Sequence, residues 1–199
     1  MKTNCRTKIQ LGLMVVGLLT IVLMIGCSEM GPTSSSEAVW VPPPPMTPEH
    51  IADAFPVGYT PVYCSENNNG MGAESDTLFR QQFIHNYEDK EVSLDHFKVK
   101  VWRECIHEDI LLTMTIPNPN IFVIDFGPHP YQFDSPVRIK IDYHSHIPYG
   151  PARDALTTLY WNGYTQTYEF VQFTNDTDHG IITAWTNHFS RYVIATGSE

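Results

Sequence analysis

The chain has 199 residues, of which 42% are hydrophobic and 12% aromatic, and it carries a formal net charge of −10. This length allows one domain of ordinary size with appendages, and the apolar content is too high for a disordered chain. The acidic balance argues against binding to nucleic acid and against electrostatic adhesion to anionic lipid.

Residues 1–26 have the organisation of an export signal. Three basic residues within the first eight positions precede an apolar run that ends in Gly26-Cys27. A basic start, an apolar stretch and a small residue are typical of a signal peptide, whereas the alternative is a plain transmembrane anchor. Leu23-Met-Ile-Gly-Cys27 also resembles the bacterial lipobox. That resemblance implies cleavage before Cys27 and attachment of fatty acyl chains such as palmitate to this cysteine.

An acylated Cys27 predicts an extracytoplasmic protein that is anchored by lipid in the cell membrane or the outer membrane. Ser28 in place of an acidic residue resembles the usual sorting pattern for the outer membrane. Residues 1–26 contain three basic residues and no acidic one, so the remaining chain carries a net charge of −13. Attachment to the membrane therefore depends on the acyl chains rather than on charge.

Four cysteines are present, and two of them belong to the export segment. Cys5 leaves with the signal, and Cys27 carries the lipid. In an exported protein the remaining Cys64 and Cys105 are candidates for a disulfide, although their separation in space decides whether they pair.

Residues 27–50 are predicted to be a Ser/Pro-rich linker. The run Pro42–Pro45 favours an extended polyproline conformation, while Trp40 and Val41 interrupt the polar composition and can dock locally. A spacer between membrane and domain is one interpretation, and a proline-rich ligand for a partner domain is another.

Residues 51–90 form a poorly defined region before the regular strands. Its residues 65–72 have the composition of a loop. Beyond them, Asp76 can cap a short helix that holds Leu78, Phe79, Phe83 and Ile84, and a strand over 78–87 is the alternative.

From residue 91 the sequence predicts an antiparallel β-sandwich, because short alternating segments follow one another between turn signals. In Val137–Tyr143 the odd-numbered residues are apolar and the residues between them are polar, which favours a half-buried strand. Asn162-Gly163 marks a hairpin turn. The expected strands cover 92–101, 110–116, 121–126, 137–143, 156–161, 167–173 and 181–195, the last as a pair or as one bent strand.

The segment Phe126-Gly-Pro-His-Pro-Tyr-Gln-Phe-Asp-Ser-Pro-Val-Arg-Ile-Lys-Ile141 resembles the signature of the ZU-five domain, a β-sandwich of zonula-occludens proteins, netrin receptors and ankyrins. His188-Phe-Ser-Arg-Tyr192 resembles the end of similar domains in bacterial surface lipoproteins. The resemblance covers residues 91–196. Gly127 is expected to turn the chain with a positive φ, and Pro136 to open a strand. These duties favour a scaffold that binds an envelope protein or polymer.

His188 and Ser190 are the candidate catalytic residues. In some relatives the His-Phe-Ser sequence resembles a self-cleavage site. The resemblance implies attack of the Ser190 hydroxyl on the Phe189 carbonyl carbon, an N-to-O acyl shift and hydrolysis of the ester, with His188 as general base. The alternative interpretation is that both are ordinary strand residues.

His144 and His146, with Asp142, are a weaker candidate for a metal site, because residues i and i+2 share one face of a strand. The residues that follow them have the composition of a loop, so a dispersed surface pair is favoured and no metal is expected. No phosphate loop, hydrolase elbow or zinc-protease motif occurs in the sequence. No cofactor is therefore expected. The predicted function is that of a non-enzymatic, lipid-anchored envelope domain, with single-turnover self-cleavage as the alternative.

Overall fold

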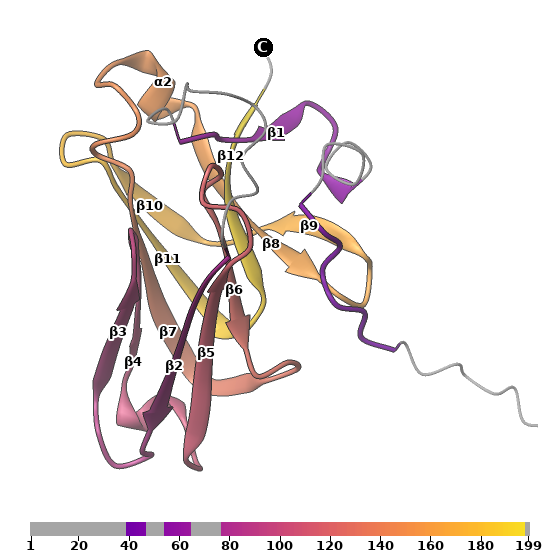
Figure 1. Cartoon of the computed structure of the whole chain (residues 1–199), viewed down its shortest axis with the longest axis vertical. Helices are drawn as coiled ribbons and strands as arrows, with labels where there is room; N and C mark the ends of the chain where they lie inside the picture. Colours follow the sequence, from indigo (N-terminus) through magenta and orange to yellow (C-terminus); the bar gives the residue numbers. More distant parts are fainter. Residues whose placement is uncertain (1–38, 47–53, 65–76, 198–199) are drawn as a thin grey trace, which may run out of the picture. The chain divides into compact units, whose positions relative to one another are not determined.

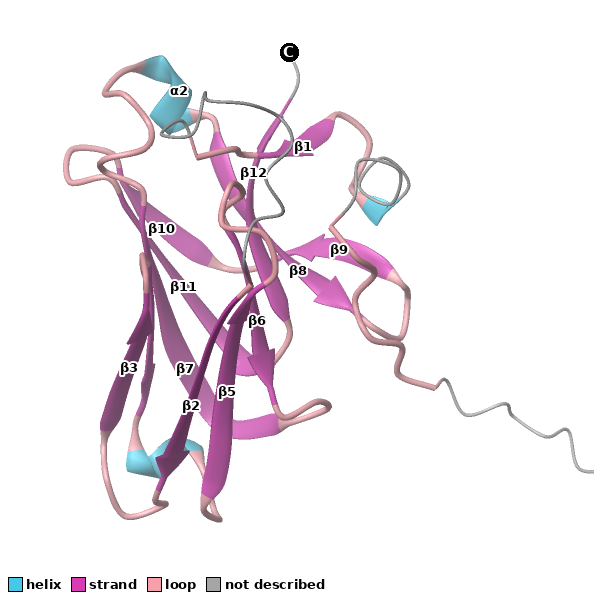
Figure 2. Cartoon of the chain, in the orientation of Figure 1, coloured by secondary structure: helices cyan, strands magenta, loops and turns pink. Residues whose placement is uncertain are grey.

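The computed structural model describes residues 39–46, 54–64 and 77–197, and its regular elements are almost all β-strands (Figures 1 and 2). They form two antiparallel sheets, which confirms the prediction of a mostly β, sandwich-like fold. The predicted signal segment and Cys27 lie outside the described residues.

Seven strands make up the larger sheet. Six of them run in the order β2-β5-β6-β12-β8-β9, and β1 pairs with β12 beyond the end of β6. Their bounds are β1 (Tyr59–Pro61), β2 (Leu78–Ile84), β5 (Ile110–Ile116), β6 (Val123–Gly127), β8 (Leu156–Asn162), β9 (Thr167–Phe170) and β12 (Arg191–Gly197).

Five strands make up the smaller sheet, in the order β10-β11-β7-β4-β3. Their bounds are β3 (Lys90–Leu94), β4 (Phe97–Val101), β7 (Gln132–Asp142), β10 (Phe173–Asp176) and β11 (Ile181–His188). Two short helical turns, η2 (Arg103–Cys105) and α2 (Pro151–Asp154), lie in connections between strands.

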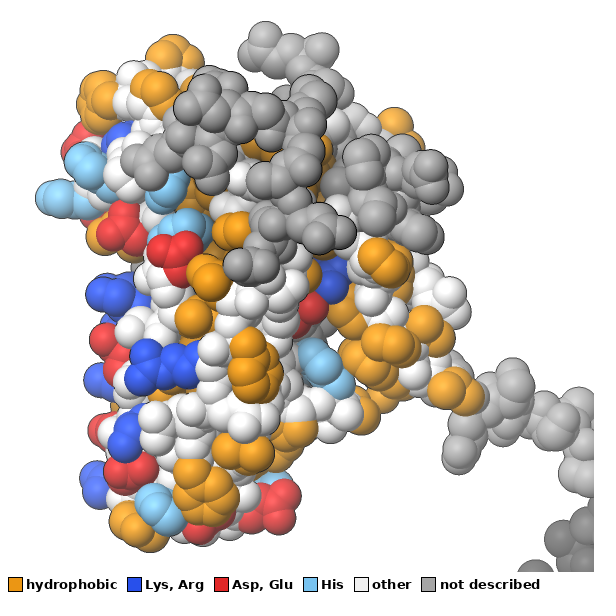
Figure 3. Space-filling view, viewed as in Figure 1, with side chains coloured by type: hydrophobic (Ala, Val, Ile, Leu, Met, Phe, Trp, Pro, Cys, Tyr) orange, Lys and Arg blue, Asp and Glu red, His pale blue; other side chains and the backbone are white. Residues whose placement is uncertain are grey.

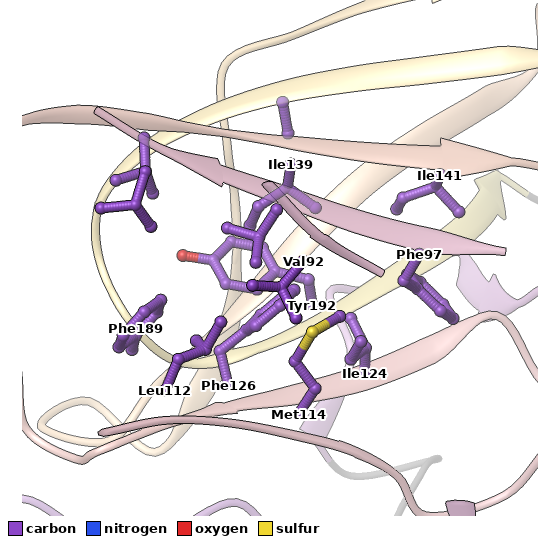
Figure 4. Packing of buried hydrophobic residues seen from close by; sticks show 14 of the residues in the cluster. Val92, Phe97, Leu112, Met114, Ile124, Phe126, Ile139, Ile141, Phe189 and Tyr192 are labelled. Atoms are coloured by element: carbon purple, nitrogen blue, oxygen red, sulfur yellow. The ribbon is translucent and has the colours of Figure 1, made fainter. Parts of the chain in front are cut away.

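The main core lies between the two sheets (Figure 4). The alternation predicted for residues 137–143 is confirmed, because Val137, Ile139, Ile141 and Tyr143 are all buried while Asp142 is exposed. On the opposing sheet, β5, β6 and β12 contribute further buried side chains. Those labelled in Figure 4 are Leu112, Met114, Ile124, Phe126 and Tyr192.

Strand β12 is buried on both faces. Tyr192 and Ile194 face the main core, whereas Val193 and Ala195 belong to a second apolar cluster on the outer side of the larger sheet. This second cluster contains residues from the segment before β1, including Phe55. A strand covered on both sides needs a nearly continuous apolar sequence, which explains why this stretch does not alternate with polar residues.

Residues 39–46, which the sequence assigns to the linker, are docked on the larger sheet, and we call them the strap. Trp161 Nε1 donates to the carbonyl oxygen of Val41 at 2.9 Å, and the Val41 amide donates to the carbonyl oxygen of Gly163 at 2.9 Å. A Cβ atom at Gly163 would lie 2.5 Å from Trp40 Nε1, so only glycine fits beneath the strap. The local docking expected for Trp40 and Val41 is confirmed.

Three expectations need correction. Residues 78–84 form strand β2, which pairs with β5 along its whole length, so the short helix expected after Asp76 is wrong and the strand alternative is confirmed. The expected strand 92–101 is a hairpin, β3 and β4, that turns at Asp95, whose φ is 52°. Expected strand 167–173 is likewise divided into β9 and β10, which lie in different sheets.

Gly127 and Pro136 also differ from the expectation, although both keep a structural role. Gly127 is required for space, because a Cβ atom there would lie 2.5 Å from Thr113 Oγ1, and its φ is not in the positive region. Pro136 does not open a strand. It lies inside β7, where the register with β11 shifts between Thr186 and His188, and this irregularity tolerates a residue without an amide proton.

Candidate functional site

The segment His188-Phe189-Ser190 is the corner at which the chain passes from one sheet to the other. Strand β11 of the smaller sheet ends at His188, and β12 of the larger sheet begins at Arg191. The Phe189 ring enters the core between the sheets, 4.6 Å from the ring of Phe133 and 5.9 Å from that of Phe126 (Figure 4). Phe189 is therefore a core residue that fixes the corner from inside.

The Ser190 hydroxyl is buried and donates a hydrogen bond to the carbonyl oxygen of Trp161 on β8. Its own carbonyl oxygen accepts from the Phe126 amide at 3.0 Å. The hydroxyl and the carbonyl group of Ser190 thus both tie the corner to the neighbouring strands. The hydroxyl proton is therefore donated to a backbone carbonyl of β8, whereas self-cleavage requires a general base to accept it.

The His188 imidazole has other partners. Its Nδ1 lies 3.3 Å from Thr186 Oγ1 and 3.2 Å from Asn187 Oδ1, and its ring meets the Tyr160 ring edge-on with centroids 4.7 Å apart. Burial lowers the pKa of His188, and the nearby His129 lowers it further. The ring is therefore neutral at pH 7, as a general base requires, but its Nδ1 contacts Thr186 and Asn187 and not the Ser190 hydroxyl.

Tyr192 fixes the same corner from the β12 side. Its buried hydroxyl lies 2.8 Å from the carbonyl oxygen of His188 and 2.7 Å from Thr186 Oγ1. A tyrosine hydroxyl bonded to backbone a few residues upstream is a known device for holding corners in β-sandwiches. The pattern His-Phe-Ser-x-Tyr is thus explained by structural contacts of its last three named residues: a core ring, a buried hydroxyl and a phenol that holds the backbone.

His129 is a residue of the corner that the sequence did not reveal. Its Nδ1 lies 3.2 Å from the carbonyl oxygen of Phe189, and because a carbonyl only accepts, this nitrogen carries the proton. Its ring stacks on Trp40 of the strap with centroids 5.0 Å apart. Burial lowers the pKa of His129, while the bond to Phe189 opposes that shift. The Phe189–Ser190 peptide bond therefore has a polarising donor.

An aromatic pocket of about 450 Å³ adjoins the corner. Its size is within the usual range for small-molecule sites. Four elements contribute its walls: the strap, the segment before β7, the β8–β9 hairpin and the corner. The residues are Trp40, Pro130, Tyr131, Gln132, Tyr160, Trp161, Asn162, Gly163, Tyr164, His188 and Phe189.

Glu169 of β9 orders one wall of this pocket. Its carboxylate accepts hydrogen bonds from the Tyr160 hydroxyl at 2.7 Å, from Asn162 Nδ2 at 2.8 Å and from Thr165 Oγ1 at 2.9 Å. The Tyr160 bond is the main cause of the lowered pKa of Glu169, and burial raises the pKa of Tyr160 to about 12. These rings are held in place before any ligand arrives, which reduces the entropic cost of binding.

The expected disulfide is not formed. Among the described residues, Cys105 is a buried thiol in η2, and its sulfur lies 3.7 Å from the carbonyl oxygen of Pro136 and 3.3 Å from Ser135 Oγ. Cys64 follows β1, where its amide donates to the carbonyl oxygen of Asn120 at 2.8 Å. Both cysteines are free thiols in this structure, so the candidate pair is not bridged here.

His144 and His146 lie in the turn after β7, with His144 exposed. His146 packs edge-on against His96, ring centroids 4.9 Å apart. Within the described residues, no group of three or more His, Cys, Asp or Glu side chains is arranged to hold a metal ion. In the same part of the chain no helix is long and apolar enough to cross a membrane.

Comparison with known proteins adds no relative. No protein-family model matches the sequence, and no curated protein matches it. Function is therefore inferred from the corner, the pocket and the surface of the sheets.

Proposed function

We propose that the chain is a lipid-anchored envelope protein whose β-sandwich serves as a non-enzymatic interaction domain, related to the ZU-five type. The observation that supports this function over self-cleavage is that the side chains of the His188–Ser190 corner make structural contacts. The Ser190 hydroxyl is bonded to the Trp161 carbonyl oxygen, the His188 imidazole contacts Thr186 and Asn187, and Phe189 fills the core. Residues required to react are thus already engaged in holding two sheets together.

The aromatic pocket supports a binding role. It is enclosed by ordered rings, and its one titratable lining side chain apart from tyrosine is His188, whose pKa is lowered by burial. Such a surface suits a neutral or amphipathic group of a partner rather than a charged substrate. The ZU-five relationship is supported by the sandwich architecture together with the structural role of Tyr192.

Lipid attachment is tested at Cys27. Cells that express the chain are labelled with radioactive palmitate, and the wild type is compared with Cys27→Ala. We expect label in the wild type alone and release of the variant from the membrane fraction. Cys5→Ala is the matched control, because that cysteine lies inside the cleaved segment. Undiminished labelling of Cys27→Ala would contradict the anchor.

One observation favours self-cleavage as a second candidate function, namely the proton that His129 directs at the Phe189 carbonyl oxygen. A donor at this position stabilises the oxyanion that forms when a hydroxyl attacks the carbonyl carbon. Cleavage would break the Phe189–Ser190 bond, and β12 would stay bound because it pairs with β1, β6 and β8. A nicked protein would therefore look intact in its native state.

Denaturing mass spectrometry of the purified mature protein separates the two candidates. The non-enzymatic function predicts one intact mass after long incubation at pH 6, 7 and 8, for both the wild type and Ser190→Ala. Self-cleavage predicts a fragment that begins at Ser190, absent from Ser190→Ala and formed more slowly once the pH falls below the lowered pKa of His188. Its appearance would replace the non-enzymatic proposal.

A further inference from the structure

The aromatic pocket lies directly beside the docked strap. Trp40 of the strap forms one of its walls, and Trp161 of β8 both lines the pocket and donates its Nε1 proton to the strap. Figure 3 shows hydrophobic side chains gathered where the strap meets the β8–β9 hairpin. The pocket is therefore continuous with a surface on which the protein already holds a proline-rich segment of its own chain.

The strap is held through its backbone carbonyl groups. Trp161 Nε1 donates to the carbonyl oxygen of Val41 at 2.9 Å, and Arg191 donates to that of Pro44. A proline-rich segment has no hydrogen bonds within its own backbone, so the surface that binds it must supply the donors. Grooves lined by aromatic rings are the sites at which several classes of peptide-binding domain recognise such ligands. The larger sheet holds the strap in this way.

The walls of the pocket repeat this chemistry. Its described lining consists mostly of aromatic side chains and contains no Asp, Glu, Lys or Arg. Two amide side chains supply donors: Gln132 is exposed at the start of β7, and Asn162 Nδ2 gives one of its two protons to Glu169 and keeps the other. Tyr164 is 55% exposed in the β8–β9 turn, where its amide donates to Asn162 Oδ1 at 3.0 Å. The pocket thus combines fixed rings with available donors and carries no charge.

The composition of these walls favours one kind of occupant. A charged partner finds no opposite charge in the described lining. A wholly apolar group would cover the amide N–H groups of Gln132 and Asn162 without bonding them, which costs free energy. A proline-rich segment meets both conditions, because its rings fill the spaces between aromatic side chains and its carbonyl groups accept from the amides. Its backbone is stiff before it binds, so little conformational entropy is lost.

We propose that the aromatic pocket binds an uncharged, proline-rich segment of a partner protein, and that this segment lies beside the strap without displacing it. The inference names the partner of the proposed interaction domain and rests on that function. Trp40 belongs to the strap, so the docked strap completes the binding site. Residues 39–46 then have a second role besides the hydrogen bonds that they make to the larger sheet.

The test uses fluorescein-labelled decaproline as probe and the mature protein, with binding measured by anisotropy. Tyr164→Ala and Gln132→Ala each remove one exposed side chain that lines the pocket. Tyr149→Ala is the matched control, because Tyr149 is 75% exposed and lies outside the pocket.

We expect saturable binding by the wild type and the control, with little dependence on salt because the lining is uncharged. Tyr164→Ala should weaken binding by about tenfold or more, since an aromatic anchor is lost. Gln132→Ala should weaken it by roughly threefold to tenfold, since one hydrogen bond is lost. A labelled Gly-Ser decamer should not bind.

Three results would overturn the proposal: a dissociation constant for decaproline above about 1 mM, equal binding of the Gly-Ser decamer, or an unchanged affinity in Tyr164→Ala. The last would mean that the peptide occupies another surface or replaces the strap. Binding of chitohexaose instead of decaproline, detected by the fluorescence of Trp40 and Trp161 and lost in Tyr164→Ala, would overturn it in favour of a glycan. None of these results bears on the lipid anchor or the uncut corner, which palmitate labelling of Cys27 and the intact mass test independently.

Discussion

At the scale of the residue, the corner between β11 and β12 shows how few side chains hold the two sheets in register. Phe189 and Tyr192 face the core, and the Ser190 hydroxyl reaches β8. Buried hydroxyl groups of this kind contribute modestly while they are bonded and cost more when a partner is left unsatisfied. The corner is therefore sensitive to single-atom changes.

Tyr192→Phe is expected to lower the free energy of unfolding by about 1–2 kcal/mol, because it leaves the His188 carbonyl and the Thr186 hydroxyl with fewer partners in a buried site. Urea unfolding followed by tryptophan fluorescence measures this loss. Tyr164→Phe is the control, since its hydroxyl is on a side chain that is 55% exposed. Equal stability of both variants would show that the phenol does not hold the corner.

The buried imidazoles of His129 and His188 predict a dependence of stability on pH. Burial lowers the pKa of both groups in the folded state, so protons bind more readily to the unfolded chain, whose histidines titrate near pH 6.5. Their contribution is fully present above pH 6.5 and is lost as pH falls through the folded pKa values. The lowered pKa values of Glu169 and Asp176 add a separate loss below about pH 4.5.

Thermal unfolding at intervals from pH 7.5 to 5 measures this dependence. We expect the Tm of the wild type to decrease across this range, and the decrease to be smaller in His129→Gln/His188→Gln. The exposed His144 provides the control His144→Gln, which should follow the wild type. A Tm that rises on acidification would contradict the assignment of neutral, buried imidazoles.

At the scale of the element, β7 decides whether the sandwich forms. Ile139 is fully buried and lies between Val99 of β4 and Ala184 of β11. Ile139→Asp is expected to unfold the domain, because a carboxylate in this position costs several kcal/mol or must be protonated. Circular dichroism and urea unfolding test this. Lys140→Asp, one residue further on the outer face, should change stability by less than about 1 kcal/mol.

Much of this element could be predicted from sequence, because burial on one face leaves a period of two that the residues themselves display. The strand Ile110–Ile116 was also predicted with its observed bounds. Residues 78–84 were ambiguous since Phe79 and Phe83 are exposed, so their apolar side chains do not mark a core face. The β3–β4 turn was missed because Asp95, and not glycine, adopts the positive φ.

The candidate site was predicted only in part. His188 and Ser190 could be selected from their spacing, but the direction of each side chain depends on β8 and on Thr186, which the motif does not contain. His129 and Trp40 are separated from Phe189 by long stretches of sequence, and their meeting is a property of the tertiary structure. The proline on each side of His129 was a signal of a constrained segment without indicating its partner.

At the scale of the whole molecule, the folded unit includes the strap, although the composition of these residues is that of a linker. Arg191 is buried in β12, where it forms a two-point contact with Asp125 and donates to the carbonyl oxygen of Pro44 in the strap. The indole of Trp161 also depends on the strap for its hydrogen bond. The second apolar cluster is thus completed by residues that precede β1.

A protein that begins at residue 47 should be less stable than one that begins at residue 39, by about 2 kcal/mol, because Trp161 Nε1 and Arg191 Nη1 both lose a carbonyl partner. Urea unfolding of the two proteins measures the difference. Gly163→Ala in the longer protein should reproduce part of the loss, because its methyl group would collide with Trp40. Indistinguishable unfolding curves would show that the strap is passive.

Because β12 is a middle strand of the larger sheet and lies near the C-terminus, the larger sheet can form only late in synthesis. Residues 191–197 pair with β1, β6 and β8, so they hold together strands that were made earlier, the earliest of them β1, in which Tyr59 pairs with Gly197. A nascent chain that lacks these residues has no middle strand for its larger sheet, and its pairings are of long range and slow to form. The larger sheet therefore closes in one late step, after nearly all of the chain has been synthesised.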